Sequence, residues 1–231
     1  MSRFVSIVCA RAGVLGASGA VAAQATSRVS LDSGGAQGNG DSSFPIFLSS
    51  AISADGRYVV FESTAMTSLC DPGAGGVIAC PCANPPGAPG RGCDNSAATG
   101  GASLAASGGA YLYSDGLVFT TAGEKPTATS ILLQGTSSPA SGVTYGQGVR
   151  CVGGTLKRLF VKSASGGSIT APDFGAGDPS VSARSAARGD VIGAGQSRFY
   201  LVYYRDPTVL GGCPASSTFN ATQTGRVNWL P

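Results

Sequence analysis

The sequence predicts an all-β fold, a β-sandwich stapled by disulfides and preceded by a separate N-terminal segment. The 231 residues include 36 Gly and 13 Pro and only 12% are charged, which favours short strands joined by tight turns, because Gly and Pro disfavour helix interiors. A hydrophobic content of 42%, with runs such as RFYLVYYR, supplies the apolar surface that disordered chains lack. The cysteines beyond residue 25 number six, an even set typical of disulfide frameworks.

Residues 1–25 carry the features of a secretory signal peptide: Arg3 and Arg11, a small apolar run at 12–22, and Ala-Gln-Ala at 23–25. The alternatives are a disordered tail or a membrane-anchoring tail. No later apolar stretch approaches the roughly 18 residues that a membrane span needs. We therefore expect a secreted, periplasmic or cell-surface protein without a membrane span.

The charge of the mature chain excludes electrostatic steering of nucleic acid. Residues 26–231 hold 13 basic and 12 acidic side chains, a net charge of +1. Lys157-Arg158 is the only adjacent basic pair, and we interpret it as a solvated strand edge. We expect no nucleic-acid partner.

Residues 26–69 form a unit of their own, in which Asp55-Gly56 is a turn and residues 58–61 are a strand that is apolar on both faces. The stretch AISADGRYVVFES, with the upstream RVSLDSGGAQGNGDSSFP, resembles a single blade repeat of the bacterial β-propellers related to the periplasmic translocation protein TolB. One blade cannot close a propeller or bury both its faces. The resemblance therefore implies either a propeller-like fragment docked on the rest of the chain or a poorly ordered arm.

Residues 70–100 are rich in Cys, Pro and Gly, and we interpret them as a stapled loop at a domain boundary. A four-thiolate zinc site would have to use Cys70, Cys80, Cys82 and Cys93, which are separated by nine, one and ten intervening residues. Zinc knuckles instead have two to four residues between neighbouring ligands. A redox dithiol usually has a C-x-x-C motif at a helix start, whereas this loop has Cys-Pro-Cys. An exported chain favours disulfides, and the predicted set is Cys70, Cys80, Cys82, Cys93, Cys151 and Cys213.

The connectivity is only partly predictable. A bond between Cys80 and Cys82 would close a short, strained ring, so we expect one of them to reach Cys70 and the other Cys93. Which cysteine goes where stays open. By elimination, Cys151 would pair with Cys213, sixty-two positions further along the chain.

Residues 101–231 contain short apolar runs separated by Gly, Pro, Asp and Ser, the pattern of a β-sandwich. Ile131 and Leu133 would share one face of a strand, and the doubly apolar run at 199–204 should be a central strand. The segment 179–190 is a partial helix candidate without a large apolar stripe. The predicted strands are 102–107, 116–123, 129–136, 148–153, 156–165, 167–172, 180–185, 197–206 and 225–230.

Residues 70–231 contain five distinctive segments, which are ACPCANPPGAPGRGCDNS, YGQGVRCVGGTLKRL, GDPSVSA, YLVYYRD and CPASSTFNATQTGRVNWLP. With them, this part of the chain resembles a C-terminal module of large exported bacterial proteins. The resemblance implies a β-sandwich appended to other domains, and it implies no enzymatic activity.

Catalysis that depends on histidine is excluded, because the chain has no histidine. The lysines at 125, 157 and 162 lie in no S-x-x-K motif, so we expect solvated lysines. No catalytic, cofactor-binding or metal residues are therefore predicted, and we expect a protein that is not an enzyme. Most acids lie in turn sequences and should shape those turns, namely Asp55, Asp94, Asp115, Asp178 and Asp206.

Calcium is the one cofactor for which the sequence offers ligands. Asp32, Asn39 and Asp41 lie in one Gly-rich loop, and Asp173 and Asp178 bracket another, so either loop could offer oxygen atoms. Neither loop matches the twelve-residue calcium loop of EF-hands.

Aromatic residues are the remaining candidate binding groups. Tyr200 and Tyr204 share one strand face and, with Trp229, are the candidate ligand-stacking residues, whereas core burial is the alternative. An exposed aromatic strip would favour a carbohydrate-binding or accessory domain of a secreted hydrolase. Full burial would favour a non-enzymatic structural or interaction module, which is the function we expect, with a cell-surface protein or a glycan as partner.

Overall fold

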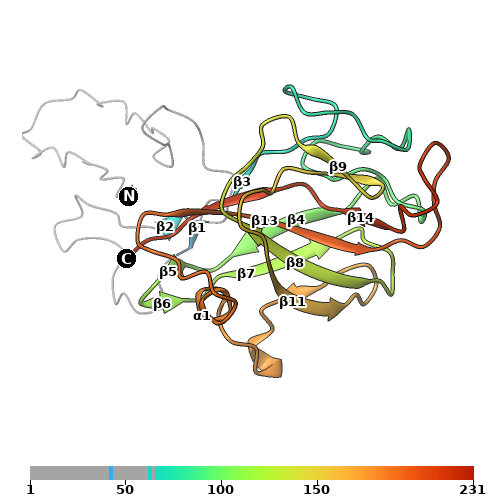
Figure 1. Ribbon diagram of the computed structural model, residues 1–231. Coiled ribbons are helices and arrows are strands. Elements are labelled where there is room, and N and C mark those ends of the chain that lie inside the picture. Colours follow the sequence, from blue (N-terminus) through green and yellow to red (C-terminus); the bar gives the residue numbers. More distant parts are fainter. Residues whose placement is uncertain (1–41, 44–61, 64–65) are drawn as a thin grey trace, which may run out of the picture. The chain divides into compact units, whose positions relative to one another are not determined.

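The computed structural model describes residues 42–43, 62–63 and 66–231 (Figure 1). The predicted signal peptide and most of the propeller-like repeat lie outside the described residues. Two short strands of the repeat, β1 (Ser42–Ser43) and β2 (Glu62–Ser63), pair antiparallel. Residues Met66–Pro231 form a separate compact unit, which begins four positions before the predicted start of the stapled loop.

The larger sheet of this unit has six strands, all paired antiparallel (Figure 1). Its longest strand lies in the centre and pairs with three others, which confirms that the run at 199–204 is central. In order across the sheet, the strands are β11 (Lys157–Ser163), β8 (Thr129–Gly135), β13 (Ser197–Arg205), β15 (Gly225–Asn228) and β3 (Thr67–Ser68), and β14 (Phe219–Ala221) pairs with the end of β13.

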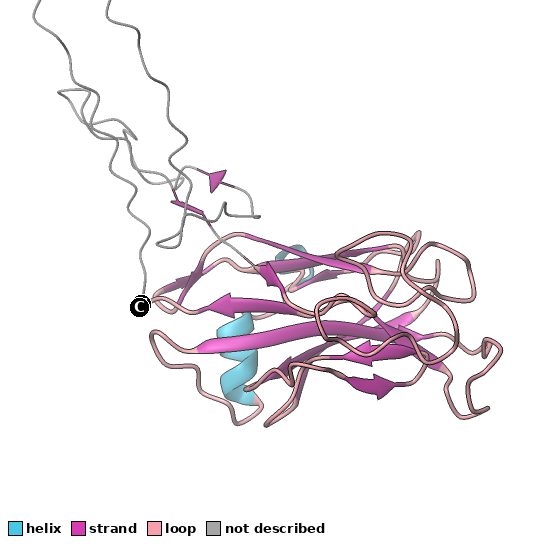
Figure 2. Ribbon diagram, turned by 90° about the horizontal axis from the view of Figure 1, so that it is seen from above, coloured by secondary structure: helices cyan, strands magenta, loops and turns pink. Residues whose placement is uncertain are grey.

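The second layer is a three-stranded sheet, and the two layers share one apolar core (Figure 2). Phe119 of the small sheet and Tyr200 of the large sheet meet across the core with ring centroids 4.6 Å apart. The predicted β-sandwich is therefore present. The small sheet comprises β12 (Thr170–Ala171), β7 (Val118–Ala122) and β4 (Ser103–Ser107), and two hairpins flank the sandwich, β5 (Ala110–Tyr111) with β6 (Ser114–Asp115) and β9 (Val143–Tyr145) with β10 (Gly148–Arg150).

A register shift in β11 decides which of its side chains face outward. The pairing with β8 is interrupted between Arg158 and Phe160, as in a β-bulge. Leu159 and Phe160 are both buried in the core, whereas Arg158 and Val161 are exposed. The bulge thus adds a large apolar side chain to the core and leaves an arginine on the solvent side of the sheet.

The predicted strand at 180–185 is wrong, because this segment forms the helix α1 (Val181–Ala187). The Ser180 side chain caps the helix by accepting a hydrogen bond from the Ala183 N–H, and the Asp115 carboxylate accepts one from the Ser182 N–H at 2.7 Å. One local cap and one long-range bond thus hold the first turn, and the partial helix candidate at 179–190 is confirmed over residues 181–187. The other helical element is the 3-10 turn η1 (Phe174–Ala176), and no helix of the described residues is long and apolar enough to cross a membrane.

Three disulfides staple the loop between β3 and β4: Cys70–Cys151 and Cys82–Cys213 hold it on the sandwich, and Cys80–Cys93 closes a ring within it. Pairing of Cys80 or Cys82 with Cys93 is confirmed. The expected Cys151–Cys213 bond is wrong, as is the expected pairing of Cys70 within the loop. The elimination argument assumed that the loop cysteines bond among themselves, whereas the loop lies over the sandwich and two of its cysteines reach sandwich residues.

Candidate functional site

The three candidate ligand-stacking residues are core residues and cannot stack on a ligand. Tyr200, Tyr204 and Trp229 are each 0% exposed. The Trp229 Nε1–H donates to the Tyr200 hydroxyl at 3.1 Å, and the Asn95 amide donates to the Tyr204 hydroxyl at 3.1 Å. Burial raises the pKa of both phenols. Their strand face packs on the small sheet, so the core alternative is correct.

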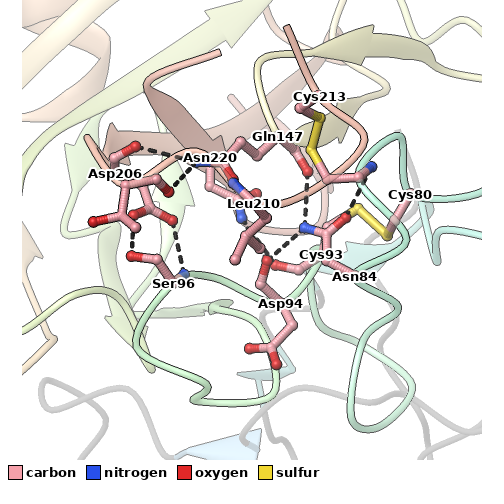
Figure 3. Close-up of a disulfide and its surroundings, with 12 residues drawn as sticks. Cys80, Asn84, Cys93, Asp94, Ser96, Gln147, Asp206, Leu210, Cys213 and Asn220 are labelled. Carbon is pink, nitrogen blue, oxygen red and sulfur yellow. Dashed lines mark hydrogen bonds between the residues drawn. A yellow bond between two sulfur atoms is a disulfide. The ribbon is translucent and has the colours of Figure 1, made fainter. Parts of the chain in front are cut away.

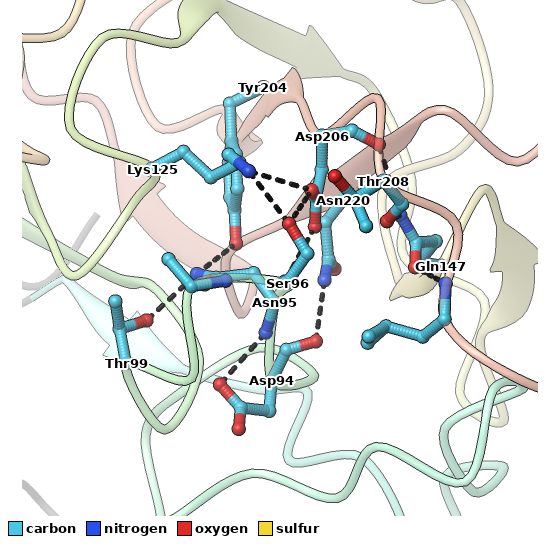
Figure 4. A network of polar contacts seen from close by, with 12 residues as sticks. Asp94, Asn95, Ser96, Thr99, Lys125, Gln147, Tyr204, Asp206, Thr208 and Asn220 are labelled. Carbon is cyan, nitrogen blue, oxygen red and sulfur yellow. Dashed lines mark hydrogen bonds and ion pairs between the residues drawn. The ribbon is translucent and has the colours of Figure 1, made fainter.

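A polar cluster around Asp206 joins the stapled loop to the end of β13 (Figure 4). The buried Asp206 carboxylate accepts hydrogen bonds from the Ser96 N–H at 2.9 Å and from the Ser96 hydroxyl. The Lys125 ammonium lies 3.6 Å from the same carboxylate and donates to the Ser96 hydroxyl at 2.7 Å. Lys125 is therefore an ion-pair partner with only 26% of its side chain exposed, not a solvated lysine.

This cluster resembles a serine–lysine pair in composition, but its hydrogen bonds are structural. The Ser96 hydroxyl accepts from Lys125 and donates to Asp206, so its polar contacts are internal. A nucleophile needs a base within reach and an open path to a reacting atom. The arrangement instead ties two distant segments together.

Three buried amide side chains extend the same scaffold beside the disulfides (Figure 3). Asn84 donates to the carbonyl oxygens of Asp94 at 2.6 Å and Gln147 at 3.0 Å. Asn220 donates to the Asp94 carbonyl at 2.8 Å, and Gln147 donates to the Asp206 carbonyl at 3.1 Å. Because the loop forms no strand ladder between residues 69 and 102, these amides satisfy backbone groups that would otherwise be unpaired.

Glu124 is a second buried acid, and its hydrogen bonds come from hydroxyl groups. Thr121 and Ser130 both donate to its carboxylate, which joins β7 to β8. Burial raises the pKa of Glu124, and the two hydroxyl bonds oppose that shift. Its side chain has no route to a ligand, so it is a structural acid.

The other predicted turn acids perform the expected task where the structure describes them. Asp94 accepts from the N–H groups of Gly100 and Gly101, and Asp115 accepts from that of Leu117.

Asp178 binds Lys162 at 2.5 Å, which leaves its loop a poor calcium site. Among the described residues, no cluster of three or more metal-binding side chains occurs. Asp55 and the other calcium loop, with Asp32, Asn39 and Asp41, lie outside the described residues.

The outer face of the large sheet carries a second apolar cluster. Leu133, Leu201 and Ala221 point outward and are buried with Val152, while Phe199 is only half-buried beside them. The segment that contains β9 and β10 supplies this cover. Part of the outer face therefore stays open to solvent at the margin of the cover.

At this margin lie three half-buried rings, Tyr145, Tyr203 and Phe219, packed edge to face. Their centroids are 5.6 Å apart for Tyr145 and Tyr203, 4.8 Å for Tyr145 and Phe219, and 6.1 Å for Tyr203 and Phe219. The Arg150 guanidinium lies 5.0 Å from the Tyr145 centroid, and that of Arg158 lies 5.8 Å from the Tyr203 centroid.

Arg205 completes the group, because it pairs with Phe219 in the sheet register and both side chains share the outer face. We name these six residues the aromatic–arginine patch. Its members come from β9, β10, β11, β13 and β14 and are Tyr145, Arg150, Arg158, Tyr203, Arg205 and Phe219.

A tight turn brings the patch together. Gly146 connects β9 to β10 with a φ of +63°, and a Cβ at this position would collide with the Phe219 backbone and ring. The following Gln147 N–H donates to the Phe219 carbonyl at 2.8 Å. Glycine thus lets the hairpin approach β14 closely enough for Tyr145 to contact Phe219.

The patch is electrostatically one-sided. Burial is the main cause that raises the pKa of Tyr145, the neighbouring Tyr203 adds to this rise, and Arg150 and Arg158 oppose it. The same holds for Tyr203, whose pKa burial raises and Arg158 lowers. Within the described residues, no salt bridge engages Arg150, Arg158 or Arg205.

Sequence reasoning missed this group. The alternation along β13 places Tyr203 on the opposite face from Tyr200, but the sequence does not reveal that a hairpin and a C-terminal strand bring Tyr145 and Phe219 beside it.

Comparisons with family models, with curated proteins and with solved structures give no match.

Proposed function

We propose that this chain is a non-enzymatic exported interaction module that binds its partner through the aromatic–arginine patch. The observation that carries the proposal is a set of partly exposed aromatic and arginine side chains on the open margin of a rigid sheet. Tyr and Arg are the residue types most enriched at protein binding surfaces. The disulfides and the buried amide network hold the sheet and hairpin that position these side chains.

The compartment supports the same proposal. Three disulfides are typical of proteins that fold in an oxidising environment outside the cytosol. Residues 1–25 carry the signal-peptide features described above, and the resemblance of residues 70–231 is to modules of exported bacterial proteins. A role as a secreted, periplasmic or cell-surface module follows from these three features together.

A carbohydrate-binding or accessory role is the second candidate, and one observation favours it. An aromatic strip is indeed partly exposed on one sheet, although at Tyr145, Tyr203 and Phe219 and not at the residues expected from the sequence. Sugar rings carry apolar C–H groups that can pack on the partly exposed edges of such aromatic side chains. In this version of the proposal, the partner is a glycan.

Binding of the exported protein to arrays of glycans and to intact bacterial cells tests the proposal. Tyr203→Ala and Arg158→Ala should each reduce binding at least tenfold. The matched controls are Tyr113→Ala and Arg188→Ala, since both residues are exposed and lie outside the patch; Tyr113 is 74% exposed. Equal binding by the patch variants and the controls would contradict the proposal.

A further inference from the structure

We propose that the patch binds an acidic polysaccharide, with Arg158, Arg205 and Arg150 pairing the carboxylate or sulfate groups of the chain. This inference rests on the proposed function and specifies its ligand. It is carried by an imbalance of charge on the outer face of the large sheet.

The acids of residues 66–231 are engaged elsewhere. Asp206 pairs with Lys125, Asp178 with Lys162 and Asp190 with Arg198. Other carboxylates accept hydrogen bonds from backbone N–H groups in turns, as Asp94 and Asp115 do. The arginines of the patch are thus left with aromatic neighbours and, among the described residues, without a counter-charge.

The geometry also leaves guanidinium groups free to bind anions. An arginine stacked over a ring still directs its N–H donors outward in its own plane, where they can form paired hydrogen bonds with a carboxylate or sulfate. Arg158 and Arg205 are exposed. The Arg205 guanidinium makes one hydrogen bond, from Nη1 to the Thr218 hydroxyl at 3.0 Å, which fixes its direction and leaves other donors available.

The ring packing favours a glycan over a nucleic acid. Base stacking needs open ring faces. Here Tyr145 and Tyr203 each have an arginine over the ring, and the three rings abut one another edge to face. The rings therefore orient arginines and offer apolar edges, which suits a chain of acidic sugars whose charges recur at short intervals.

The test measures binding of the full exported protein to polygalacturonate, with dextran as the neutral glycan, poly-glutamate as the acidic peptide and single-stranded DNA as the nucleic acid. We expect binding to polygalacturonate that weakens at least tenfold between 20 and 200 mM NaCl, on the order expected for several ion pairs. Dextran should not bind, and poly-glutamate and DNA should bind at least tenfold more weakly than polygalacturonate.

Variants locate the interaction. Arg158→Ala should lower affinity for polygalacturonate about tenfold or more, Arg158→Lys should lower it less because the charge remains, and Arg188→Ala should leave it unchanged. Equal binding of DNA or poly-glutamate, or equal binding by Arg158→Ala and Arg188→Ala, would overturn the inference. Binding of a neutral glycan or a surface protein but not of polygalacturonate, weakened in both Tyr203→Ala and Arg158→Ala, would overturn it while leaving the proposed function intact. If neither variant loses binding to any of the partners tested, both the inference and the proposed function would be overturned.

Discussion

The buried carboxylate of Asp206 accepts hydrogen bonds from both the backbone N–H and the hydroxyl of Ser96, a residue 110 positions earlier in the chain. This contact joins the end of the central strand to the stapled loop. The third residue of this polar contact is Lys125, which lies in the loop that connects β7 of the small sheet to β8 of the large sheet. The loop is therefore part of the folded unit and not a boundary between domains.

Asp206→Ala should lower the free energy of unfolding by about 3 kcal/mol, because it leaves two donors of Ser96 unpaired and Lys125 without its ion partner. Lys125→Ala should cost less, about 1 kcal/mol, since this side chain is partly exposed. Urea unfolding at pH 7 measures both variants. Equal losses would show that the ion pair, and not the buried carboxylate, dominates the contact.

Glu124 should make the protein more stable in mild acid than at neutral pH. Because the folded chain raises the pKa of Glu124 above its ordinary value of 4.5, the folded state holds this proton more tightly than the unfolded state. Its contribution is fully favourable below pH 4.5 and is lost as the pH rises through the folded pKa. Glu124→Gln should remove this dependence and raise stability at pH 7, which unfolding curves between pH 4 and 8 would show. Superimposable pH profiles of the two proteins would contradict the assignment.

Asp190 should have the opposite pH dependence. Its carboxylate binds Arg198 through two hydrogen bonds, at 2.9 and 2.8 Å, and this contact holds its pKa below the ordinary 3.8. The stabilisation is present at neutral pH and is lost as the pH falls below about 4 through the lowered pKa. Asp190→Asn should therefore reduce the free energy of unfolding at pH 7. It should also reduce the loss of stability that occurs between pH 4 and pH 2. Because Gln134 donates both to this carboxylate and to the Ser185 hydroxyl of helix α1, the helix should show faster amide exchange in this variant.

The three disulfides should contribute unequally. Cys82–Cys213 spans 131 positions and Cys80–Cys93 spans 13, so the chain-entropy relation gives about 5 and about 3 kcal/mol respectively. Paired Cys→Ser variants, compared by thermal unfolding, would rank them. Peptide mapping without reduction should recover Cys70 linked to Cys151, and recovery of a Cys151–Cys213 peptide would disprove the connectivity of the structure.

The sequence predicted the sandwich because its signals are local. The doubly apolar run in β13 and the alternation of Ile131 and Leu133 in β8 reflect burial on a pleated strand, which is readable from neighbouring residues. The segment 179–190 was only a partial helix candidate, beside a predicted strand at 180–185, because the helix depends on the Ser180 cap and on Asp115, sixty-seven positions from Ser182.

The aromatic–arginine patch could not be predicted for a similar reason. Tyr145 reaches Phe219 only because Gly146 allows a turn that docks on β14. The disulfide pairing likewise depends on where the loop lies, since Cys82 and Cys213 are far apart in sequence. Contacts of this kind arise from tertiary packing, for which spacing along the chain gives no signal.

The overlap of two disulfides has a consequence wherever the protein meets proteases. Cys70–Cys151 and Cys82–Cys213 enclose overlapping stretches, so every peptide bond between Cys70 and Cys213 is enclosed by at least one of them. A single cut anywhere in this span leaves two pieces that remain covalently joined. A nicked molecule would therefore gain only the mass of one water and would separate into two chains only after the disulfides are reduced.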